Sequence, residues 1–220
     1  MKKTILLVLL SLIVSCSCIY AQSNNTHKDQ IKASKKELSQ KASKEARKEA
    51  KRLIKEGWKV APGALPLEKQ LDKSYVMQYQ YDSDGLPTFI MAEGMSIAGN
   101  YDAAKMQALE LAKQNLAGQI QTEITALIEN TVSNEQLDQN NAATITRSVL
   151  ASKNLIAQSI GRVLPIVETY RVISNSNNQV LVRIAYSYDL AKTTAKNAIK
   201  KELEERGDSL HNKLDNLLGW

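Results

Sequence analysis

The chain has 220 residues, 29 Lys and Arg against 23 Asp and Glu, a formal net charge of +6, and only two cysteines. Cys16 and Cys18 both lie near the N-terminus, so removal of a leader that ends after them leaves no cysteine for a disulfide. This pattern excludes a small scaffold held together by disulfides and predicts a fold that depends on its hydrophobic core.

The first residues have the pattern of a secretory signal peptide. Lys2 and Lys3 precede the apolar run Ile5–Val14, which is shorter than the roughly 20 apolar residues that a membrane-spanning helix needs. We therefore expect an exported protein of the periplasm or outer membrane, with no transmembrane span in the mature chain.

Two processing routes stay open. Ala21 offers a small residue for ordinary cleavage before Gln22, whereas the run Ile13-Val14-Ser15-Cys16 resembles a bacterial lipobox, which would make Cys16 a lipidated first residue. We expect ordinary cleavage and a mature chain that begins at Gln22.

The positive charge is concentrated after the leader. Thr26–Glu56 holds eleven Lys and Arg against five Asp and Glu. Lys28–Glu56 is rich in Ala, Lys and Glu, which predicts a helix with Gly57 at its C-terminal cap. One face of this helix is weakly apolar and consists of Leu38, Ala42, Ala46, Ala50 and Leu53. The opposite face is a lysine stripe that consists of Lys41, Lys44, Lys48, Lys51 and Lys55. The pattern leaves open whether this helix docks on the core.

Hydrophobic periodicity predicts the remaining elements. A connection anchored by Trp58 leads to a helix from Leu67 towards Tyr81, a turn at Asp82–Pro87 and a strand at Thr88–Ile97. The central helix, Asn100–Val132, has Asn100 as its N-cap and buries Leu109, Ala112, Leu116, Ile120 and Leu127, with Gln107, Gln114, Gln121 and Thr125 opposite. A polar loop, a second helix (Ala142–Ile160) and a hairpin (Val163–Ile173 and Gln179–Tyr188) follow. The last element is a helix (Asp189–Leu218), which we expect Gly207 to bend or interrupt.

This order predicts an α+β fold in which a small antiparallel sheet of about three strands packs on long helices, with a basic helix ahead of it. The expected organisation is a signal peptide (1–21), a basic helical appendage (22–57) and a single α+β domain (58–220).

One family resemblance is visible in the run Ala92-Glu93-Gly94, the alanine-rich steps of the central helix and the strand Val180–Ile184. Over roughly Ala92–Asp189 the chain resembles small bacterial surface lipoproteins that share a domain with the N-terminal region of flagellar assembly protein T. The resemblance implies an α+β domain in a non-enzymatic envelope protein, and it brings no catalytic residues.

A catalytic alternative uses Ser96. Gly94-Met95-Ser96-Ile97-Ala98 partly matches a nucleophile elbow, and Asp189 and His211 follow in the order of a hydrolase triad. Ala98 replaces the second glycine of that motif, and the predicted hairpin disagrees with the parallel sheet that the elbow requires. We expect an ordinary strand-to-helix turn there.

Other candidate sites are weak. Asp82, Asp84 and Glu93 fit three positions of a calcium loop, but Pro87 replaces its glycine, so a β-turn is favoured. His27 and His211 are far apart in sequence, and no cysteine or carboxylate cluster suggests a metal site, so we predict no metal and no cofactor.

Gly118, inside the central helix, marks either a close helix contact or a neutral surface position. For the protein as a whole we expect a non-catalytic envelope protein. Its core domain would contact other envelope proteins, and its basic helix would contact anionic lipid headgroups or polysaccharide. Nucleic acid is disfavoured because we expect the chain to be exported.

Overall fold

The computed structural model describes Lys36, residues 40–83, 85–133, 139–161, 163–173 and 176–207, together with Leu210 and Leu214. The chain divides into two compact units, Met1–Ala42 and Ser43–Trp220. In the first unit, the amide of Gln40 donates to the carbonyl oxygen of Lys36 at 3.1 Å. All helices and strands named below belong to the second unit.

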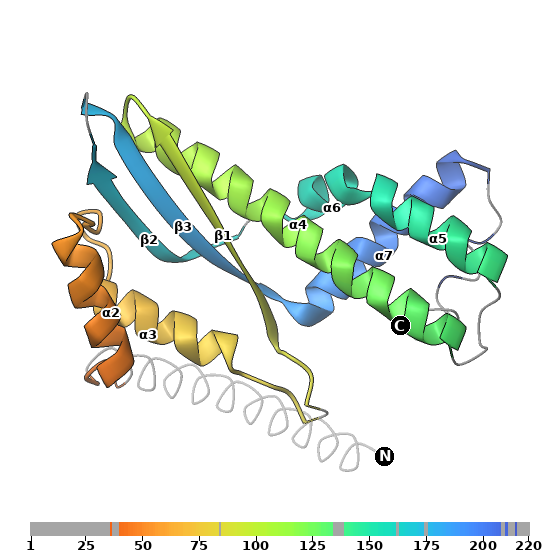
Figure 1. Ribbon diagram of the computed structural model, residues 1–220, viewed down its shortest axis with the longest axis horizontal. Helices are drawn as coiled ribbons and strands as arrows, with labels where there is room; N and C mark the ends of the chain where they lie inside the picture. The colour runs from red at the N-terminus through yellow and green to blue at the C-terminus, as the bar shows by residue number, and fades with distance from the viewer. Residues whose placement is uncertain are drawn as a thin grey trace, which may run out of the picture. The chain divides into compact units, whose positions relative to one another are not determined.

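The described part of the second unit contains six helices and three strands (Figure 1). In chain order they are α2 (Lys44–Lys55), α3 (Leu67–Gln78), β1 (Phe89–Ala98), α4 (Tyr101–Ser133), α5 (Gln139–Ala151), α6 (Lys153–Ser159), β2 (Pro165–Val172), β3 (Asn178–Ser187) and α7 (Tyr188–Glu205). This arrangement confirms the predicted α+β class, including the number of strands.

The central helix α4 forms where its periodicity predicts. The Asn100 side chain accepts the amide of Ala103 at 2.9 Å, as an N-cap does. Buried residues recur every four positions along one face: Ala104, Ala108, Ala112, Leu116, Ile120, Ile124 and Ile128. Leu109 is only partly buried, so the buried face is rotated slightly from the predicted one.

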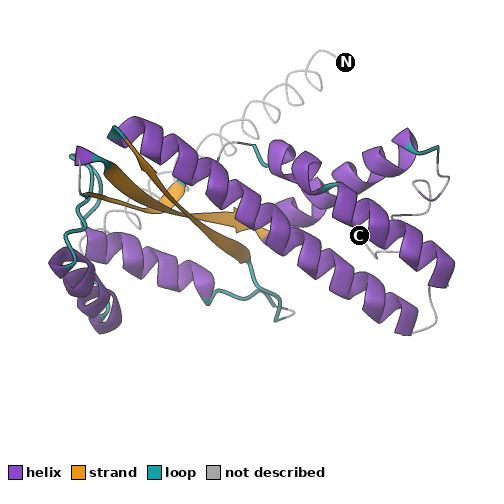
Figure 2. Cartoon of the chain, turned by 45° about the horizontal axis from the view of Figure 1, so that its top comes forward, coloured by secondary structure: helices purple, strands orange, loops and turns teal. Residues whose placement is uncertain are grey.

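The sheet has the order β1-β3-β2, with both pairs antiparallel. Alternation places Ala92 and Val182 on the face that packs on α4, and Glu93 and Arg183 on the opposite face. Arg183 donates to the Ser74 hydroxyl of α3 at 2.8 Å. Figure 2 shows the resulting layers, with the sheet between α4 and α3.

Gly94 sets the distance between β1 and α4. A Cβ atom at this position would lie 2.5 Å from the amide nitrogen of Ala112 and closer still to the carbonyl oxygen of Ala108. Those atoms are helix backbone and cannot swing aside. A Cβ atom at Gly118, which the sequence singled out, would instead lie 3.6 Å from the flexible end of the Lys153 side chain, an ordinary contact.

The predicted helix Ala142–Ile160 is wrong in one respect, because it breaks at Ser152 into α5 and α6. The Ser152 hydroxyl donates to the carbonyl oxygen of Val149 at 2.8 Å. Gln121 of α4 donates to the same oxygen at 2.6 Å and to that of Leu150 at 3.1 Å. Two side chains therefore bond carbonyl oxygens that a continuous helix would use for its own hydrogen bonds. Gln121 contacts α5 instead of pointing to solvent, which differs from the prediction.

The C-terminal helix is interrupted at Gly207, as the sequence predicts. α7 ends at Glu205, and Gly207 follows with a φ of +67°, a left-handed conformation that suits glycine. Leu203, Leu210 and Leu214 are buried, as their register predicts. The remaining residues of the predicted helix, including His211, lie outside the described part.

Candidate basic interface

Helix α2 carries the candidate site, and local signals define its ends. The Ser43 hydroxyl accepts the amide of Ala46 at 3.3 Å at the N-terminus. At the other end Gly57 has a φ of +89°, and the amides of Gly57 and Trp58 donate to the carbonyls of Ile54 and Leu53, both at 3.0 Å. This is a Schellman cap, so the predicted role of Gly57 is confirmed.

The alanine face of α2 is docked rather than free. Ala46 and Ala50 are buried, and α2 packs on α3. Asp72 of α3 accepts the backbone amide of Ser43 at 2.9 Å. The Ser43 hydroxyl and amide hold the pKa of the Asp72 carboxyl below its usual value. The compact unit therefore includes this helix, whereas the predicted boundary after Gly57 left its docking open.

The segment after α2 is fastened to the edge of the sheet. Lys59 and Tyr170 of β2 exchange backbone hydrogen bonds of 2.7 and 2.8 Å. Arg171 of β2 donates to the carbonyl oxygen of Glu56 at 3.2 Å and lies 4.6 Å from the centre of the buried Trp58 ring. A cation at a helix C-terminus is favourable, so Arg171 both caps α2 and anchors Trp58.

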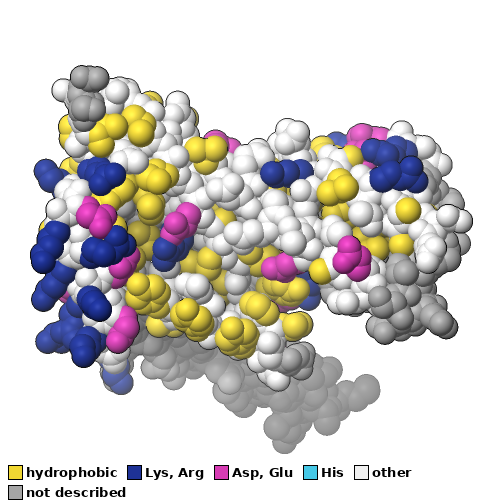
Figure 3. Space-filling view, in the orientation of Figure 1, with side chains coloured by type: hydrophobic (Ala, Val, Ile, Leu, Met, Phe, Trp, Pro, Cys, Tyr) yellow, Lys and Arg dark blue, Asp and Glu magenta, His cyan; other side chains and the backbone are white. Residues whose placement is uncertain are grey.

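The opposite face of α2 presents the predicted lysines to solvent. Lys44, Lys48, Lys51 and Lys55 are all exposed, and none has a carboxylate partner among the described residues. Figure 3 shows Lys and Arg side chains gathered over α2. We call Lys44, Lys48, Lys51 and Lys55 the lysine face. Lys41, the fifth predicted member, is exposed but belongs to the first unit.

One arginine binds two of the three carboxylates in and next to α2, and the third, Glu45, is exposed in the first turn of the helix. Arg52 pairs with Glu49 at 2.5 Å and with Glu56 at 2.6 Å. The hydrogen bond from Arg52 holds the pKa of Glu49 below its usual value. These two carboxylates therefore do not neutralise the lysine face.

A shallow depression of about 560 Å³ lies beside the lysine face. Its lining combines four cations with two carboxylates and a phenol: Lys48, Lys51, Arg52, Lys55, Glu45, Glu49 and Tyr75 of α3. Burial, and next the charge of Glu49, raise the pKa of Tyr75, so its hydroxyl stays protonated at neutral pH. The depression therefore holds more cations than carboxylates, and Glu49 is already paired with Arg52, so the remaining lysines suit an anionic ligand.

The catalytic alternative is not assembled in the described residues. Ser96 lies within β1 and donates to Gln107 at 2.6 Å. Phe89, at the other end of β1, pairs with Ser187, so Asp189 lies beyond that end, roughly 20 Å from Ser96 at about 3.3 Å per residue. His211 lies outside the described residues.

The calcium-loop residues are likewise separated. Asp82 accepts the amide of Leu86 at 2.9 Å within a turn, which confirms the predicted turn, and Glu93 pairs with Arg183 on the sheet. No cluster of His, Cys, Asp or Glu that would hold a metal occurs among the residues described. Asp84 and His27 are not described.

Sequence reasoning missed a partly buried polar network on the α4 side of the sheet. Glu168 of β2 accepts from the Tyr101 hydroxyl, pairs with Lys105 at 2.8 Å, and its backbone amide donates to Gln70 of α3 at 2.7 Å. Burial and the bond to Glu168 raise the pKa of Tyr101. Gln70, Tyr101 and Glu168 are far apart in the chain, so no local sequence pattern could indicate this network.

The processing residues Cys16, Ala21 and Gln22 lie outside the described part. Within the part that is described, no helix is both long enough and apolar enough to cross a bilayer. Comparisons with protein-family models, curated proteins and solved structures found no match. The resemblance to surface lipoproteins therefore stays a prediction.

Proposed function

We propose that this chain is a non-catalytic, exported protein of the bacterial envelope, and that it binds anionic envelope components through the lysine face of α2. The observation that carries this proposal is a row of four exposed lysines without carboxylate partners among the described residues, on a helix whose opposite face is buried. A docked helix holds its charges in a fixed row, which a free basic segment does not.

The energetics favour a charged surface as partner. Each lysine near an anionic surface contributes about 1 kcal/mol, so four acting together give roughly 4 kcal/mol. Exposed charges are screened over about 10 Å at 0.1 M salt, so the interaction should weaken as salt rises.

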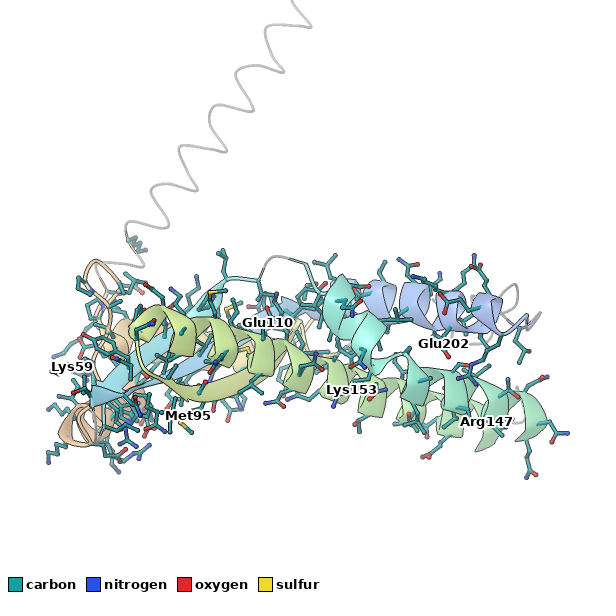
Figure 4. All side chains as sticks on the ribbon, turned by 90° about the horizontal axis from the view of Figure 1, so that it is seen from above. Lys59, Met95, Glu110, Arg147, Lys153 and Glu202 are labelled. Carbon is teal, nitrogen blue, oxygen red and sulfur yellow. The ribbon has the colours of Figure 1, made fainter. Side chains whose placement is uncertain are left out.

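Substitution tests this proposal without removing the helix. The four lysines of the lysine face are changed together to Gln, and binding to anionic vesicles and to an acidic polysaccharide is measured by sedimentation. A control with the same loss of charge changes Arg147, Lys153, Lys200 and Lys201 to Gln. Figure 4 shows Arg147 and Lys153 on α5 and α6, away from Lys59.

We expect the lysine-face variant to lose most of its binding and the control to keep it. Equal binding by both variants would mean that the lysine face is only a solvated surface. If the unchanged protein binds neither the anionic vesicles nor the acidic polysaccharide, the proposed function fails.

Export is tested separately by the intact mass of the protein isolated from the exporting cell. We expect a chain that begins at Gln22 without lipid. A diacyl or triacyl modification at Cys16 would instead support the lipobox route, and a retained leader would contradict export.

A further inference from the structure

An exposed apolar surface continues from the basic helix. Four large apolar side chains are exposed at the end of α3 and in the turn that follows it: Val76, Tyr79, Tyr81 and Leu86. Val76 and Tyr79 are 64% and 68% exposed, which is high for side chains of this size. Such a dense group in one short segment marks an interaction site more often than single exposed residues do.

Local structure brings these side chains together. Val76 and Tyr79 are three positions apart, so they lie on one side of the end of α3. Beyond them, the amide of Asp82 donates to the carbonyl oxygen of Leu86 at 2.9 Å, and Tyr81 bridges to Pro87. The turn therefore places Tyr81 opposite Pro87 and Asp82 opposite Leu86, which keeps the exposed side chains within one short segment.

This apolar group adjoins the lysine face. Tyr75, one helical turn before Tyr79, lines the same depression as Lys48, Lys51 and Lys55. On α2 itself, Ile54 is 59% exposed and lies next to Lys55 in the chain. Figure 3 shows basic side chains over α2 and hydrophobic side chains beside them in the direction of α3.

We propose that α2 and the end of α3 form one amphipathic docking surface for an anionic lipid bilayer. The lysine face would meet phosphate headgroups, while Ile54, Val76 and Tyr79 would enter the interfacial layer, where tyrosine is favoured. This inference rests on the proposed function and names the partner. An acidic polysaccharide would satisfy the lysines but would leave the aliphatic side chains without a partner.

The test separates the apolar contribution from the charge. One variant carries Ile54→Gln, Val76→Gln and Tyr79→Gln. Its matched control carries Met106→Gln, Leu150→Gln and Leu190→Gln, three exposed apolar residues of α4, α5 and α7. Both are compared with the unchanged protein, in its processed form, for sedimentation with phosphatidylcholine vesicles with and without phosphatidylglycerol, at low and high salt.

We expect the unchanged protein and the control to keep a fraction of their binding to the phosphatidylglycerol vesicles at high salt. The apolar variant should lose that fraction and bind at least roughly tenfold more weakly at low salt, because the loss of a single buried apolar side chain already weakens insertion by about this factor. Its binding to dextran sulfate should not change.

Two results would overturn the inference while leaving the proposed function intact. One is equal vesicle binding by the apolar variant and its control, with loss of binding in the lysine-face variant. The other is binding to dextran sulfate without binding to vesicles. If the lysine-face variant binds vesicles as the unchanged protein does, the proposed function fails instead.

A spectroscopic readout supports the same decision. Tyr79→Trp adds an exposed tryptophan, in contrast to Trp58, which is buried. Vesicles with brominated acyl chains should quench the added fluorescence, and Met106→Trp should not be quenched. Equal quenching of both, or of neither, contradicts insertion through α3.

Discussion

The carboxylate of Asp72 accepts the backbone N–H of Ser43 across 2.9 Å, so a side chain of α3 holds the residue that caps α2. The bond joins two helices through the first residue of one of them. It fixes the direction of α2 at its N-terminus, and therefore also the orientation of the lysine face.

The first prediction concerns this bond. Asp72→Ala should destabilise the protein by about 0.5–1.5 kcal/mol, the usual net value of one hydrogen bond. Because the pKa of Asp72 is lowered in the folded state, its contribution is present above the unfolded pKa of about 3.9 and is lost as pH falls through the folded value. Urea titrations at neutral and acidic pH measure both effects. A difference between the two proteins that persists at low pH would contradict this.

The second prediction concerns the contact between β1 and α4. Gly94→Ala should cost about 1–3 kcal/mol or more, because its methyl group meets helix backbone. Gly99→Ala is the matched control, since a Cβ there meets no atom within 4 Å. Thermal unfolding of both variants decides the matter, and equal stability would mean that the strand and helix are not closely packed.

The third prediction concerns the buried face of α4. Leu116 is fully buried, so Leu116→Ala should destabilise by roughly 2–5 kcal/mol. Gln114 lies partly exposed two residues earlier, and Gln114→Ala should change little. Denaturant titration compares them. Small, equal effects would show that the buried face has been wrongly assigned.

The fourth prediction concerns Glu123, which is half-buried on α4. Burial raises its pKa, against a smaller opposing effect of a hydrogen bond from Tyr188. A raised folded pKa favours the protonated form, so the native state gains stability from this group as pH falls and loses it as pH rises. Glu123→Gln should therefore be more stable than the unchanged protein at pH 7. The advantage should disappear near pH 4, and parallel pH profiles would show a solvated carboxylate.

The elements that follow from local patterns were predictable. The four-residue steps of α4, the paired β-branched strands and the cap at Gly57 each depend on residues close in sequence. The lysine face follows from the same periodicity. The structure bears out each of these within one or two residues at the element ends, and the interruption at Gly207 was expected. Two predicted helices are interrupted where no break was predicted: Lys28–Glu56 at residues 41–43, just before α2, and Ala142–Ile160 at Ser152.

What depended on distant partners was not predictable. The break at Ser152 requires Gln121, which lies 28 residues from Val149, the residue whose carbonyl it bonds. The need for glycine at position 94 exists only once Ala108 and Ala112 lie against it. Docking of α2 involves a hydrogen bond to Asp72 of α3, and the weak alanine face of α2 does not indicate this partner.

The attachment of Lys59 to Tyr170 also constrains the order of folding. Strand β2 is separated from Gln70 by 98 residues and from Glu56 by 115, and β1 pairs with a strand that lies almost ninety residues later. Bringing such distant segments together requires closing long loops, which slows folding. While the chain is being synthesised, α2 and α3 have no sheet to dock on until β3 has emerged. The basic helix therefore reaches its final place only when nearly the whole chain exists.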